Sequence, residues 1–195
     1  MFLKNIKDAK AFSFYFSIVG SIVTLPFVLT NGQSSRNLDT WVILILICIL
    51  IVIHNWLFLS ATKYIEPSVQ STVNRFRLIW IFLVGVLIFS EASTPTKLIG
   101  TILTISAGIV LISKYRSGMK LTGIIFTIIC TLISTIVVAS YKPLLTEFNG
   151  IALGFFVFFF PAMIIFIALP DRFNRISKLY RENNGKKWLI LAGEI

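Results

Sequence analysis

The stretch PSVQSTVNRFRLIWIFLVGVLIFSEASTPTKLIGTILTISAGIVLIS, residues 67–113, decides the fold. Its two long apolar runs are separated by a short polar turn that contains Glu91, so the stretch predicts a helical hairpin. Arg75 and Arg77 lie inside the first apolar run, where charges are costly unless they face a bundle interior or a wet cavity. These two arginines are therefore the first candidates for a functional site.

The composition of the whole chain is that of a membrane protein. Of its 195 residues 56% are hydrophobic and 13% are charged, and the mean hydropathy is +0.89. A soluble domain would carry about 25% charged residues, and a membrane-spanning helix needs about 20 apolar residues. We therefore expect an all-α, polytopic membrane helix bundle with spans near residues 11–29, 41–61, 67–90, 95–113, 120–141 and 150–169.

A seventh apolar run begins at Trp188 and stops at Ile195, which is too short for a span. The chain is accordingly expected to be a fragment. Glu194 lies in this run, about 9 Å beyond Trp188 if the run is helical. Glu194 is then either a coupling residue, which carries a proton or neutralises an arginine, or a residue of the headgroup region.

The distribution of basic residues predicts how the chain is oriented. The net charge of +10 comes from Lys and Arg in the connections between spans, which indicates a bilayer partner and no nucleic acid. Thirteen basic residues fall on the side that holds the N-terminus, and the other side has Arg36, Lys97 and Lys142. The positive-inside rule therefore places the N-terminus in the cytoplasm, with the protein in the cell membrane.

Polar residues inside the second and third spans predict a binding site. Helical spacing puts Gln70, Asn74 and Arg77 on one stripe, with Arg75 on the neighbouring stripe. At ~1.5 Å per residue, His54 in the preceding antiparallel span reaches a depth similar to that of Arg75. We expect the cytoplasmic half of the membrane to hold a pocket formed by His54, Asn55, Gln70, Asn74, Arg75 and Arg77.

Guanidinium groups in such a pocket would attract a small anionic or zwitterionic substrate. Alternatively, Arg75 and Arg77 snorkel to the headgroups or pair with a carboxylate elsewhere, and His54 is a hydrogen-bonded packing residue. Glu91 is expected near the outer surface in a structural role at a helix end. Gly100 and Gly108 follow the small-xxx-small pattern of close helix packing, which also favours a structural role.

The motifs of other classes of chemistry are missing from the sequence. It has one His, no HExxH or HxxxD spacing and no GxxxxGK[ST], so neither a metal, a cofactor nor a nucleotide is expected. Cys48 and Cys130 lie in the middle of two predicted spans, 82 residues apart in the sequence. We therefore expect both to be buried, free thiols. An enzyme is therefore not expected. Two alternatives to a transporter remain. The first is a membrane scaffold without transport activity, and the second, which the sequence favours less, is a membrane-embedded lipid-modifying enzyme.

Two observations indicate an internal repeat and a family. The first two spans resemble the sixth and seventh, and a period of five spans inverts the second copy. The segments "SATKYIEPS", "LIFS" before Glu91, "TPTKLIG" and "SAGIVLI" resemble the EamA-type transporters of the drug/metabolite transporter superfamily. "LTGIIFTIICTLISTIVVASYKPLL" is similar to the opening helix of that family's second repeat.

The resemblance implies ten helices in two inverted five-helix repeats, and a permease that works by alternating access. Residues 1–117 would be helices two to five of the first repeat, and residues 118–195 the truncated second repeat. The family's proline midway along the helix before the glutamate is replaced here by "RFRLIW", so we expect one unbroken helix. Family members usually start in the cytoplasm one helix earlier, so the charge count implies a nine-helix variant or inverted insertion.

Overall fold

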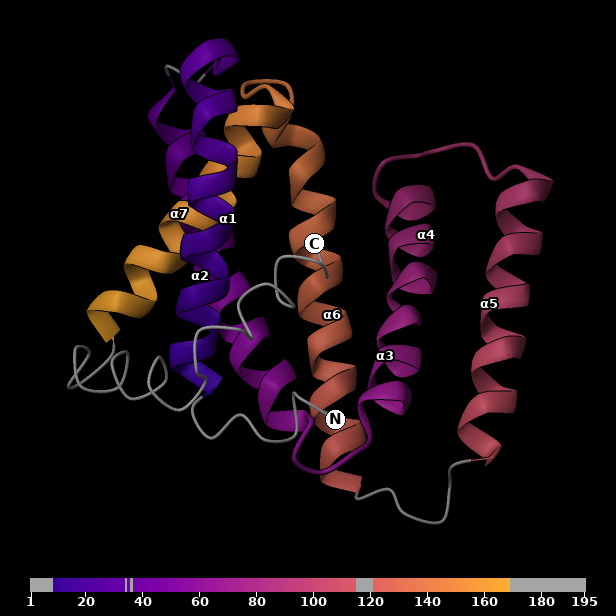
Figure 1. Ribbon diagram of the computed structural model, residues 1–195. Coiled ribbons are helices and arrows are strands. Elements are labelled where there is room, and N and C mark those ends of the chain that lie inside the picture. Colours follow the sequence, from indigo (N-terminus) through magenta and orange to yellow (C-terminus); the bar gives the residue numbers. More distant parts are fainter. Residues whose placement is uncertain (1–8, 34, 36, 115–120, 169–195) are drawn as a thin grey trace. The chain divides into compact units, whose positions relative to one another are not determined.

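The computed structural model describes residues 9–33, 35, 37–114 and 121–168. The described part is helical and contains no strand. Figure 1 shows the order of its helices, which are α1 (Ala9–Asn31), α2 (Leu38–Ala61), α3 (Pro67–Arg75), α4 (Arg77–Leu87), α5 (Pro95–Lys114), α6 (Leu121–Leu144) and α7 (Gly150–Ala168). The chain forms two compact units, one of residues 53–143 and the other, among the described residues, of 9–52 and 144–168.

In the described part of the chain, four helices are long and apolar enough to cross a membrane: α1, from Ser13 onward, α2, α6, from Thr122 onward, and α7. A shorter apolar helix covers Pro95–Val110 within α5. The prediction of an all-α membrane protein is thus confirmed. The apolar run from residue 188 lies outside the described residues.

The prediction of one unbroken helix from residue 67 to residue 90 is wrong. α3 ends at Arg75 and α4 begins at Arg77. At the break, the amide of Phe76 donates to the carbonyl of Val73 at 3.1 Å, and the amide of Ile79 donates to the carbonyl of Phe76 at 3.0 Å. Both bonds span three residues, so the chain passes through a tighter turn than an α-helix allows.

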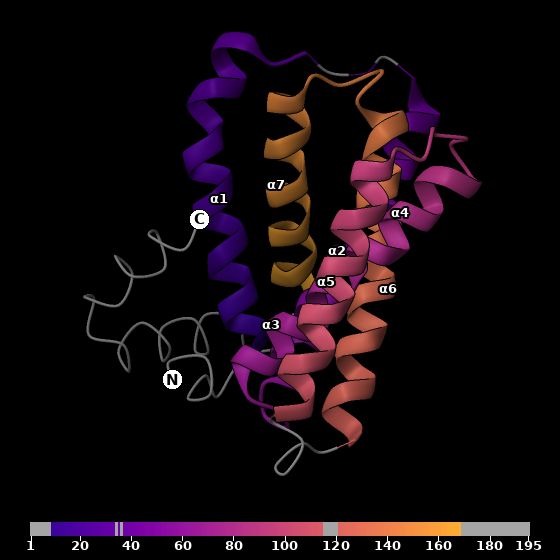
Figure 2. The same cartoon turned by 90° about the vertical axis from the view of Figure 1, so that its right-hand side faces the viewer.

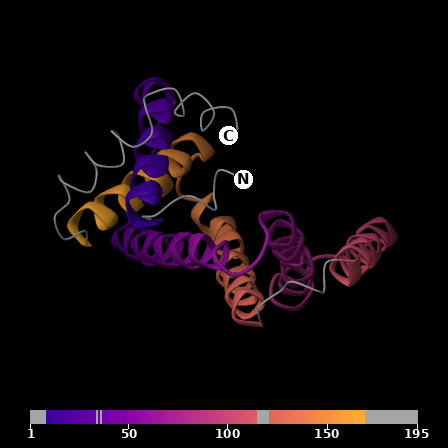
Figure 3. The same ribbon diagram turned by 60° about the horizontal axis from the view of Figure 1, so that its bottom comes forward.

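The break at Phe76 coincides with a tertiary contact to α5. A Cβ atom added at Gly108 would lie 2.7 Å from Cζ of the Phe76 ring, so the ring packs directly over this glycine. α3 and α4 both contact α5, and Figures 1 and 3 show α5 beside them. Packing of an aromatic ring onto a glycine thus marks the break, with no proline in the sequence at that place.

In the same unit, α6 packs along the end of α2. A Cβ added at Gly123 would lie 2.6 Å from Cγ2 of Ile65, and the thiol of Cys130 donates to the carbonyl of His54 at 3.7 Å. Thr127 and Thr131 are buried, and their hydroxyls donate to carbonyls of α6 itself. These two hydroxyls are thus bonded within α6, and α6 contacts the end of α2.

In the other unit, α1 and α7 lie side by side (Figure 2). A Cβ added at Gly20 of α1 would lie 2.5 Å from the Phe158 ring of α7, so the helices approach closely there. Trp41 at the start of α2 makes edge contacts with Phe148 and Phe156, each at a centroid distance of 5.0 Å. Edge-to-face aromatic packing of this kind joins the start of α2 to Phe148, just before α7, and to Phe156 within α7.

Candidate functional site

Gln70 on α3 is the most deeply buried of the predicted site residues. Its side chain is 1% exposed, and its Nε2 donates to the carbonyl oxygen of Phe58 at 2.5 Å. That carbonyl belongs to the last turn of α2, where carbonyls have no partner within the helix. Gln70 therefore joins α3 to the end of α2, while its Oε1 is buried without a hydrogen-bond partner among the described residues.

His54 and Asn55 lie on α2, one turn before Phe58. The Nδ1 atom of His54 lies 3.3 Å from Oδ1 of Asn55, and the imidazole stacks on the Phe58 ring at a centroid distance of 5.9 Å. Nε2 of His54 is buried, and no described residue bonds to it. His54 and Gln70 thus meet through Phe58, one at its ring and the other at its carbonyl.

Asn74 and Arg77 extend this group along α3 and into α4. Asn74 lies one turn beyond Gln70, and its Oδ1 is also buried without a partner in the described part of the chain. Arg77 is half-buried and is the first residue of α4. We call His54, Asn55, Gln70, Asn74 and Arg77 the polar cluster.

Arg75 differs from the polar cluster in its surroundings. Its side chain is exposed, as is that of Ser71 one turn earlier, whereas Gln70 is buried and Arg77 half-buried. The neighbouring stripes of α3 thus have different environments. Of the six residues of the predicted pocket, Gln70 is buried, four are half-buried and one, Arg75, is exposed.

The buried atoms of the polar cluster that lack a hydrogen-bond partner lower the stability of the folded protein. Leaving a buried acceptor without a hydrogen bond costs about 1–3 kcal/mol, and His54, Gln70 and Asn74 each contribute one such atom. Native proteins keep few such groups, and those that persist commonly serve a ligand, a water molecule or another conformation. The polar cluster therefore holds three buried acceptor atoms without a described hydrogen-bond partner.

A second group of charged residues surrounds Glu91, after α4. The carboxylate of Glu91 lies 2.8 Å from Nζ of Lys142 on α6 and 3.3 Å from Nζ of Lys97 on α5. The hydrogen bond from Lys142, followed by that from Lys97, holds the pKa of Glu91 below its ordinary value. We call these three residues the carboxylate clamp, because one carboxylate joins three helices.

The backbone before Glu91 brings its carboxylate back onto α4. Ser90 has a φ of 50°, a left-handed conformation that commonly ends a helix, and the amide of Glu91 donates to the carbonyl of Gly85 at 3.0 Å. A Cβ added at Gly85 would lie 3.3 Å from Oε2 of Glu91. The sequence analysis missed this arrangement, and its only local sign is Gly85 six residues before the glutamate.

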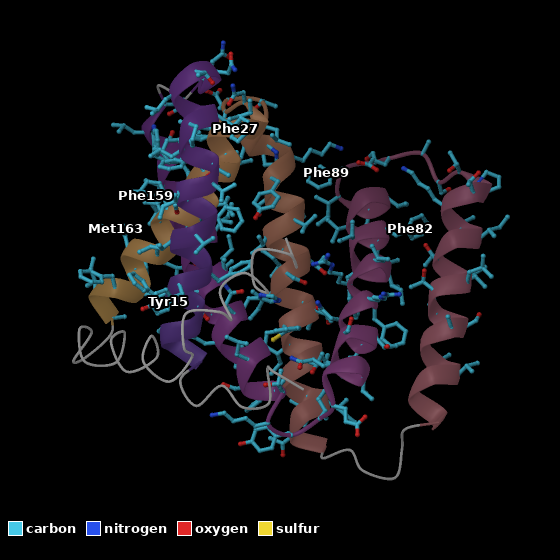
Figure 4. All side chains as sticks on the ribbon, in the orientation of Figure 1. Tyr15, Phe27, Phe82, Phe89, Phe159 and Met163 are labelled. Atoms are coloured by element: carbon cyan, nitrogen blue, oxygen red, sulfur yellow. The ribbon has the colours of Figure 1, made fainter. Side chains whose placement is uncertain are left out.

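The carboxylate clamp borders a hollow of about 390 Å³ between α4 and α5. Figure 4 shows Phe82 on the side of α4 that faces α5, and Phe89 nearer to α6. The ammonium group of Lys142 lies 4.4 Å from the centroid of the Phe89 ring. The hollow is lined by Leu78, Ile81, Phe82, Val86, Glu91, Lys97, Gly100, Thr101 and Thr104.

The two predicted packing glycines lie in different surroundings on α5. Gly108 is buried under the Phe76 ring, whereas Gly100 is exposed and borders the hollow next to the carboxylate clamp. Among the described residues, no atom lies within 4 Å of a Cβ added at Gly100. Only Gly108 thus makes a close helix contact here. Glu194 lies outside the described residues.

The model of the EamA-like transporter family matches residues 3–114. This segment is more than half of the chain and contains the whole polar cluster, Glu91 and both α5 glycines. The chain belongs to the EamA-like transporter family. A search of curated proteins found no match. Family membership and the four apolar helices together make the chain a multi-pass membrane protein of a transporter family.

The matched segment of this EamA-like transporter includes the polar cluster but only part of the carboxylate clamp. Glu91 and Lys97 lie inside residues 3–114, whereas Lys142 lies on α6 beyond it. Within the described residues, no group of three His, Cys, Asp or Glu side chains could hold a metal ion. Cys48 and Cys130 are free and buried.

The other unit of this EamA-like transporter has an apolar hollow of about 410 Å³ between α1 and α7. Figure 4 shows Phe159 and Met163 on α7 in this unit, beside α1. Its lining is Phe14, Ile18, Ser21, Ile22, Leu25, Phe155, Phe159, Ala162, Met163 and Phe166. Ser21 donates its hydroxyl to the carbonyl of Ser17 at 2.8 Å, so this hollow presents an apolar surface.

Proposed function

We propose that this EamA-like protein is a secondary transporter that carries a small anionic or zwitterionic molecule across the cell membrane by alternating access. The polar cluster would bind the substrate, with Arg77 as the cationic contact. The single observation that supports this proposal most is the set of buried, unpartnered atoms on His54, Gln70 and Asn74. A bound polar molecule would supply the missing hydrogen bonds.

The broken helix at the polar cluster adds support. Transporters commonly build their binding sites where a membrane helix is interrupted, since the freed backbone groups and nearby side chains can contact a substrate there. In this chain Phe76 separates α3 from α4, between Asn74 and Arg77 of the polar cluster. A movement of α3 against α4 would change the surroundings of the cluster without unfolding either helix.

The unpartnered atoms are buried in this structure, so we take it to represent a closed state of the cluster. Alternating access requires such a state between the inward-open and outward-open states. In our proposal the N-terminus is cytoplasmic, residues 1–117 and 118–195 belong to inverted repeats, and Glu194 couples transport to a proton. Arg75, on the exposed face of α3, would contact lipid headgroups or another part of the protein.

An efflux experiment that covers many compounds at once tests the proposal. The purified protein is reconstituted into liposomes loaded with an isotope-labelled extract of small metabolites, and mass spectrometry follows which compounds leave. We expect at least one polar compound to leave faster than from protein-free liposomes. If no compound does so under any imposed pH or sodium gradient, the protein is a membrane scaffold or an enzyme and the transporter proposal fails.

A further inference from the structure

The hollow between α4 and α5 is apolar except where it meets the carboxylate clamp. Two of its lining residues, Thr101 and Thr104, carry hydroxyls, but each hydroxyl donates to a carbonyl of α5 itself at 2.8 Å. Away from the clamp, the other lining residues are Leu78, Ile81, Phe82, Val86 and Gly100. The charged side chains of this hollow are therefore gathered at one end.

The charged end of the hollow lies at the level of the lipid headgroups. Lys142 of the carboxylate clamp is in the last turn of α6, a helix of membrane-spanning length, and such helices end near the headgroups. From there the hollow follows α4 between Val86 and Leu78 and α5 between Lys97 and Thr104, over about 10–12 Å of each helix. The apolar part of the hollow thus extends toward the hydrocarbon core.

The helices on both sides of the hollow are loosely covered in the described part of the chain. No residue of α4 is buried, and Leu78 is exposed. On α5, Gly100 is exposed, as are Ile99 and Ile102, and no described atom lies within 4 Å of a Cβ added at Gly100. At membrane depth, an exposed apolar surface of this kind contacts acyl chains.

The carboxylate clamp has one positive charge more than its single carboxylate balances. Lys142 makes the shorter contact with Glu91, 2.8 Å to Oε1, whereas Lys97 lies 3.3 Å from Oε2. Lys97 and Glu91 line the hollow, and the ammonium group of Lys142 lies 4.4 Å from the centroid of the Phe89 ring. Because Lys142 offsets the charge of Glu91, Lys97 keeps its charge and spare N–H groups for an anion in the hollow.

From this arrangement we infer that the hollow binds an anionic phospholipid, with the phosphate against Lys97 and one acyl chain between α4 and α5. A phosphodiester brings the one negative charge that balances the clamp, and its acyl chain matches the apolar lining. A lipid with a choline headgroup would add a third cation beside Lys97 and Lys142. The residues of this site are not those of the polar cluster, and the inference does not rest on the proposed function.

Native mass spectrometry of the purified protein in a neutral detergent tests the inference. It measures the dissociation constant of the first bound lipid for phosphatidylglycerol and for phosphatidylcholine with the same acyl chains. Phosphatidylglycerol should bind about tenfold more tightly, because only its headgroup is an uncompensated anion. Inorganic phosphate and glycerol 3-phosphate, which have no acyl chain, should not displace it at concentrations equal to that of the lipid.

Substitutions in the carboxylate clamp test the role of each charge. Lys97→Gln should weaken binding of phosphatidylglycerol by about tenfold or more, and Glu91→Gln should strengthen it because both ammonium groups are then free. Lys142→Gln should weaken binding indirectly, since Glu91 then pairs with Lys97. Lys142 is thus a positioning residue, and the double variant Glu91→Gln with Lys142→Gln should return close to the native affinity.

The acyl chain is tested at Gly100. Gly100→Leu should fill the hollow without a clash, because the space around an added Cβ is open, and should weaken binding of phosphatidylglycerol by about tenfold. Gly154→Leu on α7 is the matched control, since no described atom lies within 4 Å of its added Cβ either. It should leave the affinity unchanged.

Four outcomes would overturn the inference. The first is equal affinity of the native protein for the two lipids, a comparison that needs no variant to fold. The second is displacement of the lipid by either chainless phosphate compound, which would mean a site for a small anion. The third is a native affinity for Lys97→Gln, and the fourth is equal affinity of Gly100→Leu and Gly154→Leu.

Discussion

Glu91 and Lys142 form an ion pair at 2.8 Å although 51 residues separate them in the chain. Glu91 follows α4 and Lys142 lies in the last turn of α6, and Lys97 at the start of α5 contacts the second carboxylate oxygen. The carboxylate clamp therefore joins the ends of three helices in one unit. Its residues are substantially exposed, with side chains 41–53% accessible, so its contribution depends on pH and salt.

Glu91→Gln should lower the thermal stability of the detergent-solubilised protein modestly at pH 7. The folded-state pKa of Glu91 is depressed, so its stabilisation is fully present above the ordinary value of 4.5 and is lost as the pH falls toward the folded pKa. The difference in melting temperature between the native protein and Glu91→Gln should therefore shrink below about pH 4.5.

Glu66→Gln, at an exposed carboxylate before α3, is the matched control for Glu91→Gln. High salt should reduce the effect of Glu91→Gln at pH 7 because it screens exposed ion pairs. A melting temperature of Glu91→Gln equal to that of the native protein at pH 7 and low salt would show that the clamp contributes nothing to stability.

Gly108→Ala should destabilise the protein by about 1–3 kcal/mol, because its methyl group would overlap the Phe76 ring. Gly100→Ala on the same helix is the control, since no described atom lies near its added Cβ. Phe76→Leu should reduce the cost of Gly108→Ala, since the smaller side chain leaves more room. Unfolding in mixed detergent micelles measures these differences. Equal costs for the two alanine variants would refute the close contact.

The helices were largely predictable from the sequence because an apolar run of membrane length has few alternatives to a helix. The predicted spans 41–61 and 120–141 correspond to α2 and α6 within a few residues. The break at Phe76 was not predictable, since "RFRLIW" contains neither proline nor glycine. Its accompanying contact is with Gly108, which is 32 residues away and belongs to another helix.

For the candidate site, local spacing led to the candidate residues, but it did not predict their environments. The stripe of Gln70, Asn74 and Arg77 is the more buried one, and Arg75 is exposed on the neighbouring stripe. Helical periodicity gives the relative angles of these side chains, but it does not say which angle faces the bundle. The bond from Gln70 to the Phe58 carbonyl depends on how α2 ends, and Lys142 reaches Glu91 only through tertiary packing.

Cysteine labelling tests the proposed orientation. In a background where Cys48 and Cys130 are alanines, Asn183→Cys should react with a membrane-impermeant reagent only after the membrane is opened. Ala92→Cys, in the exposed α4–α5 connection, should react in intact cells. In the proposed orientation, the basic residues of 171–187 would keep that loop in the cytoplasm. The reversed labelling pattern would mean that the protein inserts the other way round.

Glu194→Gln tests the proposed proton coupling. If Glu194 titrates during the transport cycle, uptake by the native protein should depend on pH and uptake by Glu194→Gln should depend on it much less. Uptake over a range of external pH, at equal amounts of protein in the membrane, measures this. An unchanged pH profile and rate in the variant would assign Glu194 to the headgroup region.

The most direct test of the binding role of the polar cluster is the efflux rate of the Arg77 variants in the liposome experiment. At equal protein density, Arg77→Ala and Arg77→Lys should release the transported compound at least about tenfold more slowly than the native protein, because a lysine cannot reproduce a bidentate contact with a carboxylate. Arg75→Lys, on the exposed face of α3, should stay close to the native rate. Native rates for both Arg77 variants would contradict the assignment of the substrate site to the polar cluster.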